Sequence, residues 1–325
     1  MIKLYRFDDL KPEEILNRDI RAEKNVEDVV DGIIAEVRAR GDAALKDYAL
    51  KFDGATIENL QVTQEEIDEA FANMDPYFVE TLREAAANIE AFHRQQVHKN
   101  FVVNDKPGIV LGQKYTPIEK AGVYVPGGTA AYPSTVLMDV IPAKVAGVSE
   151  IVMTTPAGKD GKVNPVILAA AATAGVTKIF KTGGAQAVAA LAYGTESIPA
   201  VDKIVGPGNI YVATAKRKVF GKVGIDMIAG PSEILVLADG GCNPAWVAAD
   251  LLSQAEHDKL ASPVLVTDSE ELAKAVQAEL EVQIPQLPRA AIARASVDDN
   301  GKIIVCSDLH KAIEACNIIA PEHLE

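Results

Sequence analysis

Apolar residues recur at three- and four-residue spacing through much of the first hundred residues, a period typical of amphipathic helices. Residues 26–39 and 76–97 show the pattern most clearly. It predicts a helical segment over residues 13–103, in which strands are scarce. Because such a segment has too few strands to build a sheet of its own, we expect it to pack against a sheet formed elsewhere in the chain.

From about residue 121 the pattern changes to short β-branched runs, each followed by glycine or proline and then by an alanine-rich amphipathic stretch. This alternation predicts βαβ units, in which helices cover both faces of a parallel sheet. The expected strand and helix pairs of a first series are 123–125 with 132–148, 151–153 with 165–174, 178–180 with 185–193, and 203–205 with 210–220. Those of a second series are 234–237 with 244–257, 264–266 with 269–282, and 303–305 with 308–316.

The two series predict two α/β lobes, with hinges near Gly122 and near residues 229–231. At 325 residues, of which 48% are hydrophobic, the chain is long enough for two packed domains. We predict that residues 1–120 and 234–325 form one discontinuous lobe, because the helical segment needs a sheet. Residues 121–233 are predicted to form the other lobe.

The net charge of −14 argues against a nucleic-acid or anionic-membrane partner, since either needs a basic surface. Three scattered cysteines, Cys242, Cys306 and Cys316, are too few for a disulfide framework. The first residues have no apolar core of the kind that a signal peptide requires, and the apolar stretch 165–176 is too short to cross a bilayer. We therefore expect a cytoplasmic protein, with no membrane span, that acts on a small molecule.

Three glycine-rich turns are expected where a strand ends and a helix begins: Pro126-Gly127-Gly128, Gly183-Gly184 and Gly206-Pro207-Gly208-Asn209. Such turns direct backbone N–H groups at an anion, and the helix dipole adds to the attraction. None completes the G-x-G-x-x-G fingerprint. Each glycine could simply permit a tight turn. Three such turns in one lobe, at the edge where α/β sheets bind ligands, favour a nucleotide.

Two further pairs of residues could carry chemistry. Gln254 and His257 are three apart at the end of a predicted helix, so both side chains leave one face and could share a metal. From the spacing alone, a solvated helix end is the better interpretation. Glu322 and His323 follow Pro321 and could exchange protons near neutral pH, although adjacent pairs of this kind are usually surface residues.

The turn between the lobes contains Ser232 and Glu233. It would place both residues at the mouth of a cleft between the lobes, where substrates commonly bind. The alternative is a hinge with a serine that caps a helix.

Together these stretches resemble the histidinol dehydrogenase family. Residues 225–239, followed by 247–257, are similar to that family's signature over its whole length. The resemblance covers essentially all 325 residues. Further matches fall in the family's order at residues 40–45, 123–128, 183–187, 206–209 and 321–324.

The resemblance implies NAD-dependent oxidation of L-histidinol to L-histidine through histidinaldehyde, the last step of histidine biosynthesis. It also implies an aldehyde-dehydrogenase-like fold with two incomplete Rossmann-like lobes, and a homodimer. The family's site residues correspond to Tyr124, Gln186 and Asn209 at NAD; Ser232, Gln254, His257 and His323 at the substrate; Gln254 and His257 at zinc; and Glu322 and His323 as the catalytic acid–base pair.

One departure from the family concerns the metal. Family members continue beyond the position of Glu325, and a zinc site needs about four ligands. The family's other two ligands, an Asp and a His, are expected in that continuation. We therefore expect half a metal site and a chain that is incomplete for catalysis.

Two other functions stay open at this point. A cysteine-dependent aldehyde dehydrogenase needs an accessible thiol with a low pKa, and only Cys242 is a plausible one, since Cys306 and Cys316 lie in apolar runs expected in the core. A non-catalytic nucleotide-binding or assembly module of the same fold is the second alternative.

Overall fold

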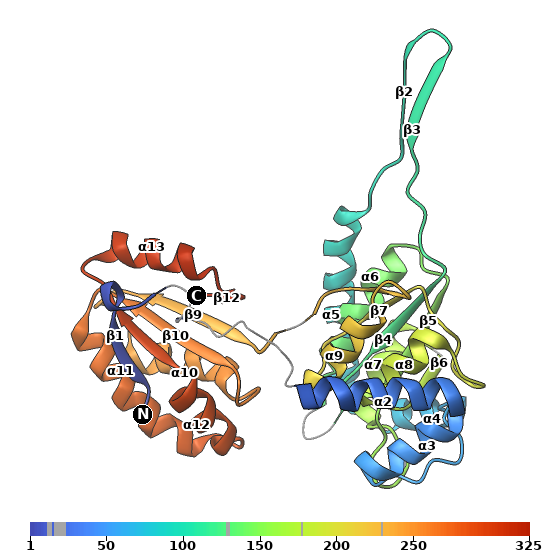
Figure 1. Cartoon of the computed structure of the whole chain (residues 1–325), viewed down its shortest axis with the longest axis horizontal. Helices are drawn as coiled ribbons and strands as arrows, with labels where there is room; N and C mark the ends of the chain where they lie inside the picture. Colours follow the sequence, from blue (N-terminus) through green and yellow to red (C-terminus); the bar gives the residue numbers. More distant parts are fainter. Residues whose placement is uncertain (12–14, 16–23, 128–130, 177, 229) are drawn as a thin grey trace. The chain divides into compact units, whose positions relative to one another are not determined.

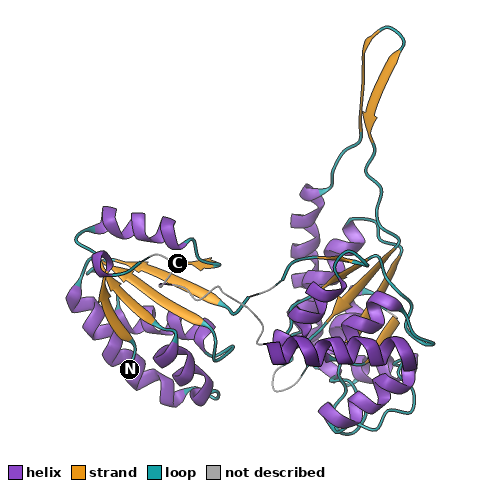
Figure 2. Ribbon diagram, in the orientation of Figure 1, coloured by secondary structure: helices purple, strands orange, loops and turns teal. Residues whose placement is uncertain are grey.

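A computed structural model describes residues 1–11, 15, 24–127, 131–176, 178–228 and 230–325. The chain divides into two compact units: unit 1 is Met1–Ile20 with Gly230–Glu325, and unit 2 is Arg21–Ala229. Each unit contains a five-stranded sheet flanked by helices (Figures 1 and 2). Among the described residues, none of the helices combines the length and apolar character that crossing a membrane requires.

The sheet of unit 2 has the strand order β6-β5-β4-β7-β8, and all its neighbours are parallel. Its first four strands in sequence overlap the predicted runs, and an α-helix follows each of these. The parallel α/β prediction is therefore confirmed. The strands are β4 (Lys120–Tyr124), β5 (Glu150–Thr155), β6 (Lys178–Lys181), β7 (Lys203–Val205) and β8 (Gly224–Ile225), and the helices that follow the first four are α6 (Pro133–Val145), α7 (Pro165–Ala174), α8 (Gly184–Tyr193) and α9 (Ile210–Val219).

The N-terminal helices belong to unit 2. Helix α2 packs on α8 and α9, while α4 and α5 pack on α6 and α7 at the other face of the sheet. The predicted helical character is confirmed, but the predicted assignment of residues 21–120 to the lobe of residues 234–325 is wrong, and so is the hinge near Gly122. The spacing of apolar residues shows that a helix has a buried face, not which sheet that face covers. These helices are α2 (Lys24–Arg40), α3 (Asp42–Tyr48), α4 (Gln64–Ala72) and α5 (Pro76–His93).

A β-hairpin projects from the body of unit 2 (Figure 1). Its antiparallel strands are β2 (Phe101–Lys106) and β3 (Ile109–Gln113), and every residue of both is exposed. The helical prediction is thus wrong for residues 101–103. Pro107 and Gly108, which lie between the two apolar runs, were the signal for a turn, and Gly108 has a φ of +78°.

The sheet of unit 1 has the order β1-β11-β10-β9-β12, again parallel throughout. Alternate strand residues face opposite sides, so Leu265 and Ile303 pack with α10, α11 and α12, while Val264 and Ile304 pack with α13. The strands are β1 (Lys3–Arg6), β9 (Glu233–Ala238), β10 (Ser262–Thr267), β11 (Lys302–Val305) and β12 (His323–Leu324), and the helices are α10 (Pro244–Ala255), α11 (Glu270–Gln283), α12 (Ala290–Asp299) and α13 (Leu309–Ile319).

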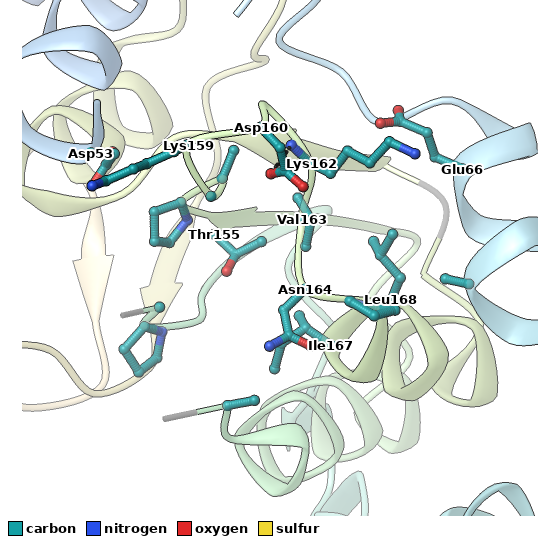
Figure 3. Close-up of a pocket in the computed structure, with 18 of the residues that line it drawn as sticks. Asp53, Glu66, Thr155, Lys159, Asp160, Lys162, Val163, Asn164, Ile167 and Leu168 are labelled. Carbon is teal, nitrogen blue, oxygen red and sulfur yellow. Dashed lines mark hydrogen bonds between the residues drawn. The ribbon is translucent and has the colours of Figure 1, made fainter. Parts of the chain in front are cut away.

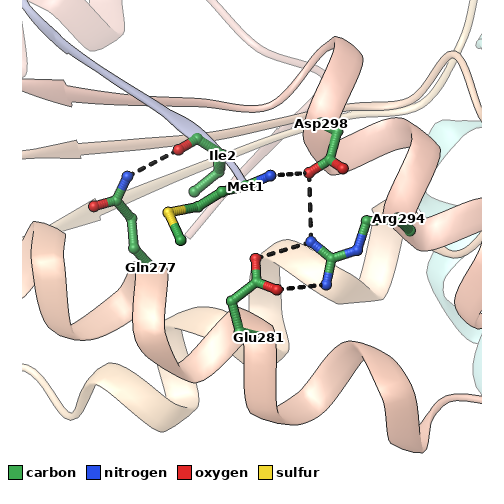
Figure 4. A network of polar contacts seen from close by, with 6 residues as sticks. All are labelled: Met1, Ile2, Gln277, Glu281, Arg294 and Asp298. Atoms are coloured by element: carbon green, nitrogen blue, oxygen red, sulfur yellow. Dashed lines mark hydrogen bonds and ion pairs between the residues drawn. The ribbon is translucent and has the colours of Figure 1, made fainter.

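The start of the chain is fastened into unit 1 (Figure 4). The amino group of Met1 lies 2.5 Å from Oδ1 of Asp298, and the carbonyl of Ile2 accepts a hydrogen bond of 2.8 Å from Gln277. Ile2 is buried, and β1 pairs with β11 along its whole length. For these first residues, the prediction that the N-terminus joins the C-terminal part of the chain is confirmed.

Candidate functional site

The strand order of unit 2 changes direction between β4 and β7. The chain runs from β4 outward through β5 to β6 and then returns to β7 on the other side of β4. In α/β sheets of this kind, ligands bind at the carboxyl ends of the strands where the order reverses. Tyr124 ends β4 and the Gly206–Asn209 turn follows β7, so the structure places both at this edge.

Tyr124 contacts one of the predicted nucleotide turns. Its hydroxyl accepts a hydrogen bond of 3.1 Å from the backbone N–H of Gly184. Burial raises the pKa of the Tyr124 hydroxyl above its usual value. Gln186 lies in the first turn of α8 after this contact and is also buried. The N–H of Gly184, which the sequence suggested for a phosphate, is thus already engaged.

Asn209 caps helix α9. Its Oδ1 accepts hydrogen bonds from the backbone N–H groups of Tyr211 and Val212, at 3.1 and 3.2 Å. An amide that accepts through oxygen still has its NH₂ group to donate. The Nδ2 atom of Asn209 is therefore the part of this side chain that suits a ligand at the strand edge.

Three glycines in these turns are required by close packing. A Cβ atom on Gly127 or Gly183 would lie 2.3 or 2.8 Å from the ring of Pro156, and one on Gly206 would lie 2.1 Å from the carbonyl oxygen of Tyr124. Gly206 also has a φ of +117°. The interpretation that a glycine permits a tight turn is confirmed at Gly206 by its positive φ, while close packing, which was not predicted, requires glycine at all three positions. Gly128 lies outside the described residues.

A half-buried acid lies close to the turn that follows β7. Asp139, on α6, has a buried oxygen, Oδ2, without a hydrogen-bond partner among the described residues. Burial raises the pKa of the Asp139 carboxyl to about 7; the Asp226 carboxylate adds to the rise, and the Lys216 ammonium opposes it. Sequence analysis missed all three of these residues.

Replacing Asp139 with asparagine is expected to change how stability depends on pH. The pKa of this carboxyl in the folded chain, about 7, lies above its ordinary value of 3.8, so its contribution to stability is present below about pH 4 and is lost as pH rises to about 7. An amide does not titrate. Urea unfolding of both chains at pH 5 and pH 8 should show a larger advantage for the variant at pH 8, and an equal difference at both pH values would contradict the assignment.

A pocket of about 850 Å³ lies beside the turn that follows β4 (Figure 3). Its wall includes Pro126 and Gly127, the loop between β5 and α7 with Lys159, and acidic residues of the N-terminal region such as Asp53 and Glu66. Tyr124, Gln186 and Asn209 are absent from its lining. The predicted nucleotide residues and this pocket thus occupy neighbouring parts of the same strand edge. Sequence analysis did not find the pocket.

The predicted site residues of unit 1 lie at the amino ends of the strands, whereas those of unit 2 lie at the carboxyl ends. Ser232 precedes β9, and Glu322 precedes β12. Helix α10 returns from β9 to the start of β10, so its last turn, which contains Gln254, reaches this same edge.

Glu322 and His323 form hydrogen bonds with Glu233, the first residue of β9. The backbone N–H of Glu322 donates to Oε2 of Glu233, and the N–H of Glu233 donates to Oε2 of Glu322, both at 3.3 Å. Nδ1 of His323 lies 3.0 Å from the carbonyl oxygen of Glu233. Because a carbonyl oxygen only accepts, Nδ1 carries the proton in this contact, and the lone pair of a neutral ring is then on Nε2.

The metal prediction is supported only in part by the geometry. Helix α10 ends at Ala255, so His257 lies beyond it, and the argument that Gln254 and His257 share a helix face does not apply. Gln254 is half-buried, and His257 is exposed. In the part of the chain that the structure describes, no three His, Cys, Asp or Glu residues are grouped to hold a metal ion. One amide and one imidazole do not complete a zinc site.

Ser232 is held at the start of the sheet by its carbonyl, which accepts a hydrogen bond of 2.9 Å from the N–H of Ser262. It precedes a strand, so the alternative that it caps a helix is wrong. That the side chains of Ser232, Gln254 and His257 lie close together stays a prediction. Ala229, in the expected hinge, lies outside the described residues, while the boundary between the two units falls there as predicted.

Cys306 and Cys316 are buried, as expected, and burial raises the pKa of each thiol to about 11. A thiol of this kind is a poor nucleophile at neutral pH. Cys242 is exposed, and its Sγ lies 3.7 Å from Oδ1 of Asp239.

The family model described as histidinol dehydrogenase matches residues 16–325. The chain belongs to the histidinol dehydrogenase family. The histidinol dehydrogenase of Geobacillus kaustophilus is 58% identical over 293 residues, which are 90% of this chain and 69% of that protein. A crystal structure of histidinol dehydrogenase from Elizabethkingia anophelis superposes with a TM-score of 0.92 at 38% identity, over 99% of this chain and 75% of that one.

Membership of the histidinol dehydrogenase family makes the chain part of an oxidoreductase family of histidine biosynthesis, and it confirms the resemblance drawn from the sequence. The fold also resembles a salicylaldehyde dehydrogenase from Pseudomonas putida G7, with a TM-score of 0.50 at 12% identity, over 91% of this chain and 81% of that one. This likeness concerns the fold alone, and it agrees with the aldehyde-dehydrogenase-like architecture predicted for the chain.

Proposed function

We propose that this chain serves the NAD-dependent oxidation of L-histidinol to L-histidine through histidinaldehyde. The observation that carries the proposal is the contact between Nδ1 of His323 and the carbonyl of Glu233. It orients the ring and leaves Nε2 as a base, beside a carboxylate, Glu322, that can activate water. Family membership supplies the substrate class.

In the first oxidation, Nε2 of His323 takes the proton of the histidinol hydroxyl, while a hydride leaves the carbon that bears this hydroxyl. Bound NAD supplies the hydride acceptor in each oxidation. His323 then releases its proton to solvent. Glu322 next removes a proton from water as the water oxygen attacks the aldehyde carbon, and it then returns this proton to the former aldehyde oxygen, which gives the hydrate. In the second oxidation, His323 takes a hydroxyl proton from the hydrate, and loss of a second hydride yields the carboxylic acid.

The nucleotide side of the proposal rests on the edge of unit 2 where the strand order reverses. Tyr124, Gln186 and Asn209 lie at this edge, and the capping geometry leaves Nδ2 of Asn209 as a donor for an oxygen of the dinucleotide. Ser232 is proposed to contact the substrate on the side of unit 1. A homodimer and a cytoplasmic location stay predictions.

Zinc fits the described residues only partly, since Gln254 and His257 offer two neutral donors and no anionic group to offset the charge of the metal. We therefore assign no step to the metal. The 325-residue chain is expected to bind zinc weakly or not at all, and to oxidise histidinol poorly, because the substrate would lack that anchor.

The test is histidinol-dependent NADH formation, followed by absorbance with zinc added. It compares this chain with a version joined to the part of the Geobacillus kaustophilus protein that it does not match. We expect the extended chain to form two NADH for each histidinol, because the alcohol and then the hydrate each lose one hydride. An aliphatic amino alcohol of similar size is the control substrate, and equal rates with it would overturn the proposal.

Two outcomes would support the alternatives. NADH formation that disappears in a Cys242→Ala chain would indicate cysteine chemistry, whereas we expect no change. NAD binding without NADH formation in either version would indicate a non-catalytic module.

Equal turnover by the short and extended chains would show that the expected metal site is misplaced.

A further inference from the structure

Both backbone groups of Gly206 are held by one ion pair, in which the lysine is buried and the aspartate is partly exposed. The N–H of Gly206 donates to Oδ2 of Asp226 at 2.9 Å, and its carbonyl accepts a hydrogen bond of 2.9 Å from Nζ of Lys216. Nζ of Lys216 also contacts Oδ1 of Asp226 directly. The lysine comes from the middle of α9 and the aspartate from the residue after β8, so two separate elements meet at one peptide unit.

The burial of Lys216 sets this pair apart from the ion pairs at the surface. The side chain of Lys216 is 3% exposed. On the same helix, Lys218 pairs with Asp31 at 2.8 Å, and its side chain is 28% exposed. Burying a lysine costs free energy that a packed apolar side chain would not, and ion pairs of this kind are often replaceable without loss of stability. A contribution to stability therefore does not by itself explain why a lysine lies at this buried position.

The clamped peptide unit lies where the nucleotide is proposed to bind. Gly206 packs against the backbone of Tyr124 and leads, three residues later, to the capping residue Asn209. Asp139 lies near the same pair, since the charges of Asp226 and Lys216 both act on the pKa of its carboxyl. The position of Asn209 relative to Tyr124 thus depends on how the Gly206 peptide is held.

We propose that Lys216 and Asp226 are positioning residues that clamp the Gly206 peptide and so set the Gly206–Asn209 turn to receive the dinucleotide. The inference rests on the proposed NAD function and gives a role to two residues to which the family resemblance assigned none. Neither side chain needs to touch the dinucleotide. Their effect passes through the two hydrogen bonds to Gly206, which preorganise the turn before the ligand arrives.

The test is calorimetric titration of NAD into the 325-residue chain and into a double variant, Lys216→Met with Asp226→Val. Replacing both partners avoids leaving one buried charge unpaired. We expect one NAD site per chain in both, with the Kd of the double variant raised about tenfold or more, since charge-assisted hydrogen bonds are lost from the turn. Lys218→Met, which removes a surface ion pair from the same helix, should leave the Kd unchanged.

The number of sites separates positioning from a merely structural role. An unchanged Kd overturns the inference, whether the variant has full occupancy or fewer sites through partial misfolding. If the double variant does not fold, the same titration is carried out with Asp226→Asn, which keeps the shape of the side chain. We expect a smaller rise in the Kd for NAD, and an unchanged Kd again overturns the inference. Failure of the parent chain to bind NAD would instead remove the nucleotide part of the proposed function, and this inference with it.

Discussion

Replacing His323 with alanine is expected to slow histidinol oxidation by about 100- to 10,000-fold, the usual contribution of a positioned general base. The contact of Nδ1 with the Glu233 carbonyl directs Nε2 as the proton acceptor, and alanine leaves no group there to take the hydroxyl proton. The measurement is kcat for NADH formation by the extended chain. Because β12 pairs with β9 through backbone groups, the variant should keep its sheet.

His310→Ala is the matched control, since His310 is an exposed histidine of α13 in the same unit. It should leave kcat unchanged. Full activity of the His323→Ala chain would mean that another group takes the proton and that the assignment of His323 is wrong. A loss of activity with both variants would indicate damage to unit 1 rather than loss of a base.

Gly206→Ala is expected to destabilise unit 2 by roughly 3 to 5 kcal/mol. Two costs add: an L-residue at a φ of +117° is strained, and its Cβ would lie 2.1 Å from the carbonyl oxygen of Tyr124. The oxygen belongs to the backbone of the central strand β4 and cannot rotate away as a side chain can. Amide hydrogen exchange of peptides that contain β4 should therefore rise steeply.

Gly221→Ala separates the two costs. Gly221 has a φ of +96°, and a Cβ atom there would meet nothing within 4 Å. This variant should lose only about 1 to 3 kcal/mol, the cost of the backbone conformation. If the two variants proved equally stable, the packing of Gly206 on Tyr124 would be looser than the structure indicates.

Local patterns predicted most of the α/β elements because each element carries its own signal. The stretch 165–174 is apolar, begins with a proline and is followed by Gly175, and it forms α7 with the same bounds. The β-branched runs at 178–180 and 303–305 lie within β6 and β11. The strand β1 gives a weaker signal, because its partner β11 lies some three hundred residues away and no local spacing encodes that pairing.

The residues of the candidate site that lie in family motifs could be predicted from the sequence. The contacts that hold these residues in place were much harder to predict, because they depend on tertiary packing. Glu322 and His323 could be named from the sequence, but the role of the Glu233 carbonyl depends on β12 pairing with β9. Lys216 offered one signal that was missed: it lies four residues after Val212 and three before Val219, both buried, so a charged residue falls on an apolar face. Such a lysine must find a partner, and the sequence does not show which.

The fastening of Met1 and β1 into the C-terminal sheet has a consequence for synthesis on the ribosome. Unit 2 is continuous in sequence, so all of it has been made once residue 229 has emerged, and domains tend to fold as units as they appear. The edge strand β1 is made before unit 2, yet its partner β11 is translated only after unit 2. The nascent chain must therefore carry an unpaired N-terminal strand while the whole of unit 2 is completed behind it.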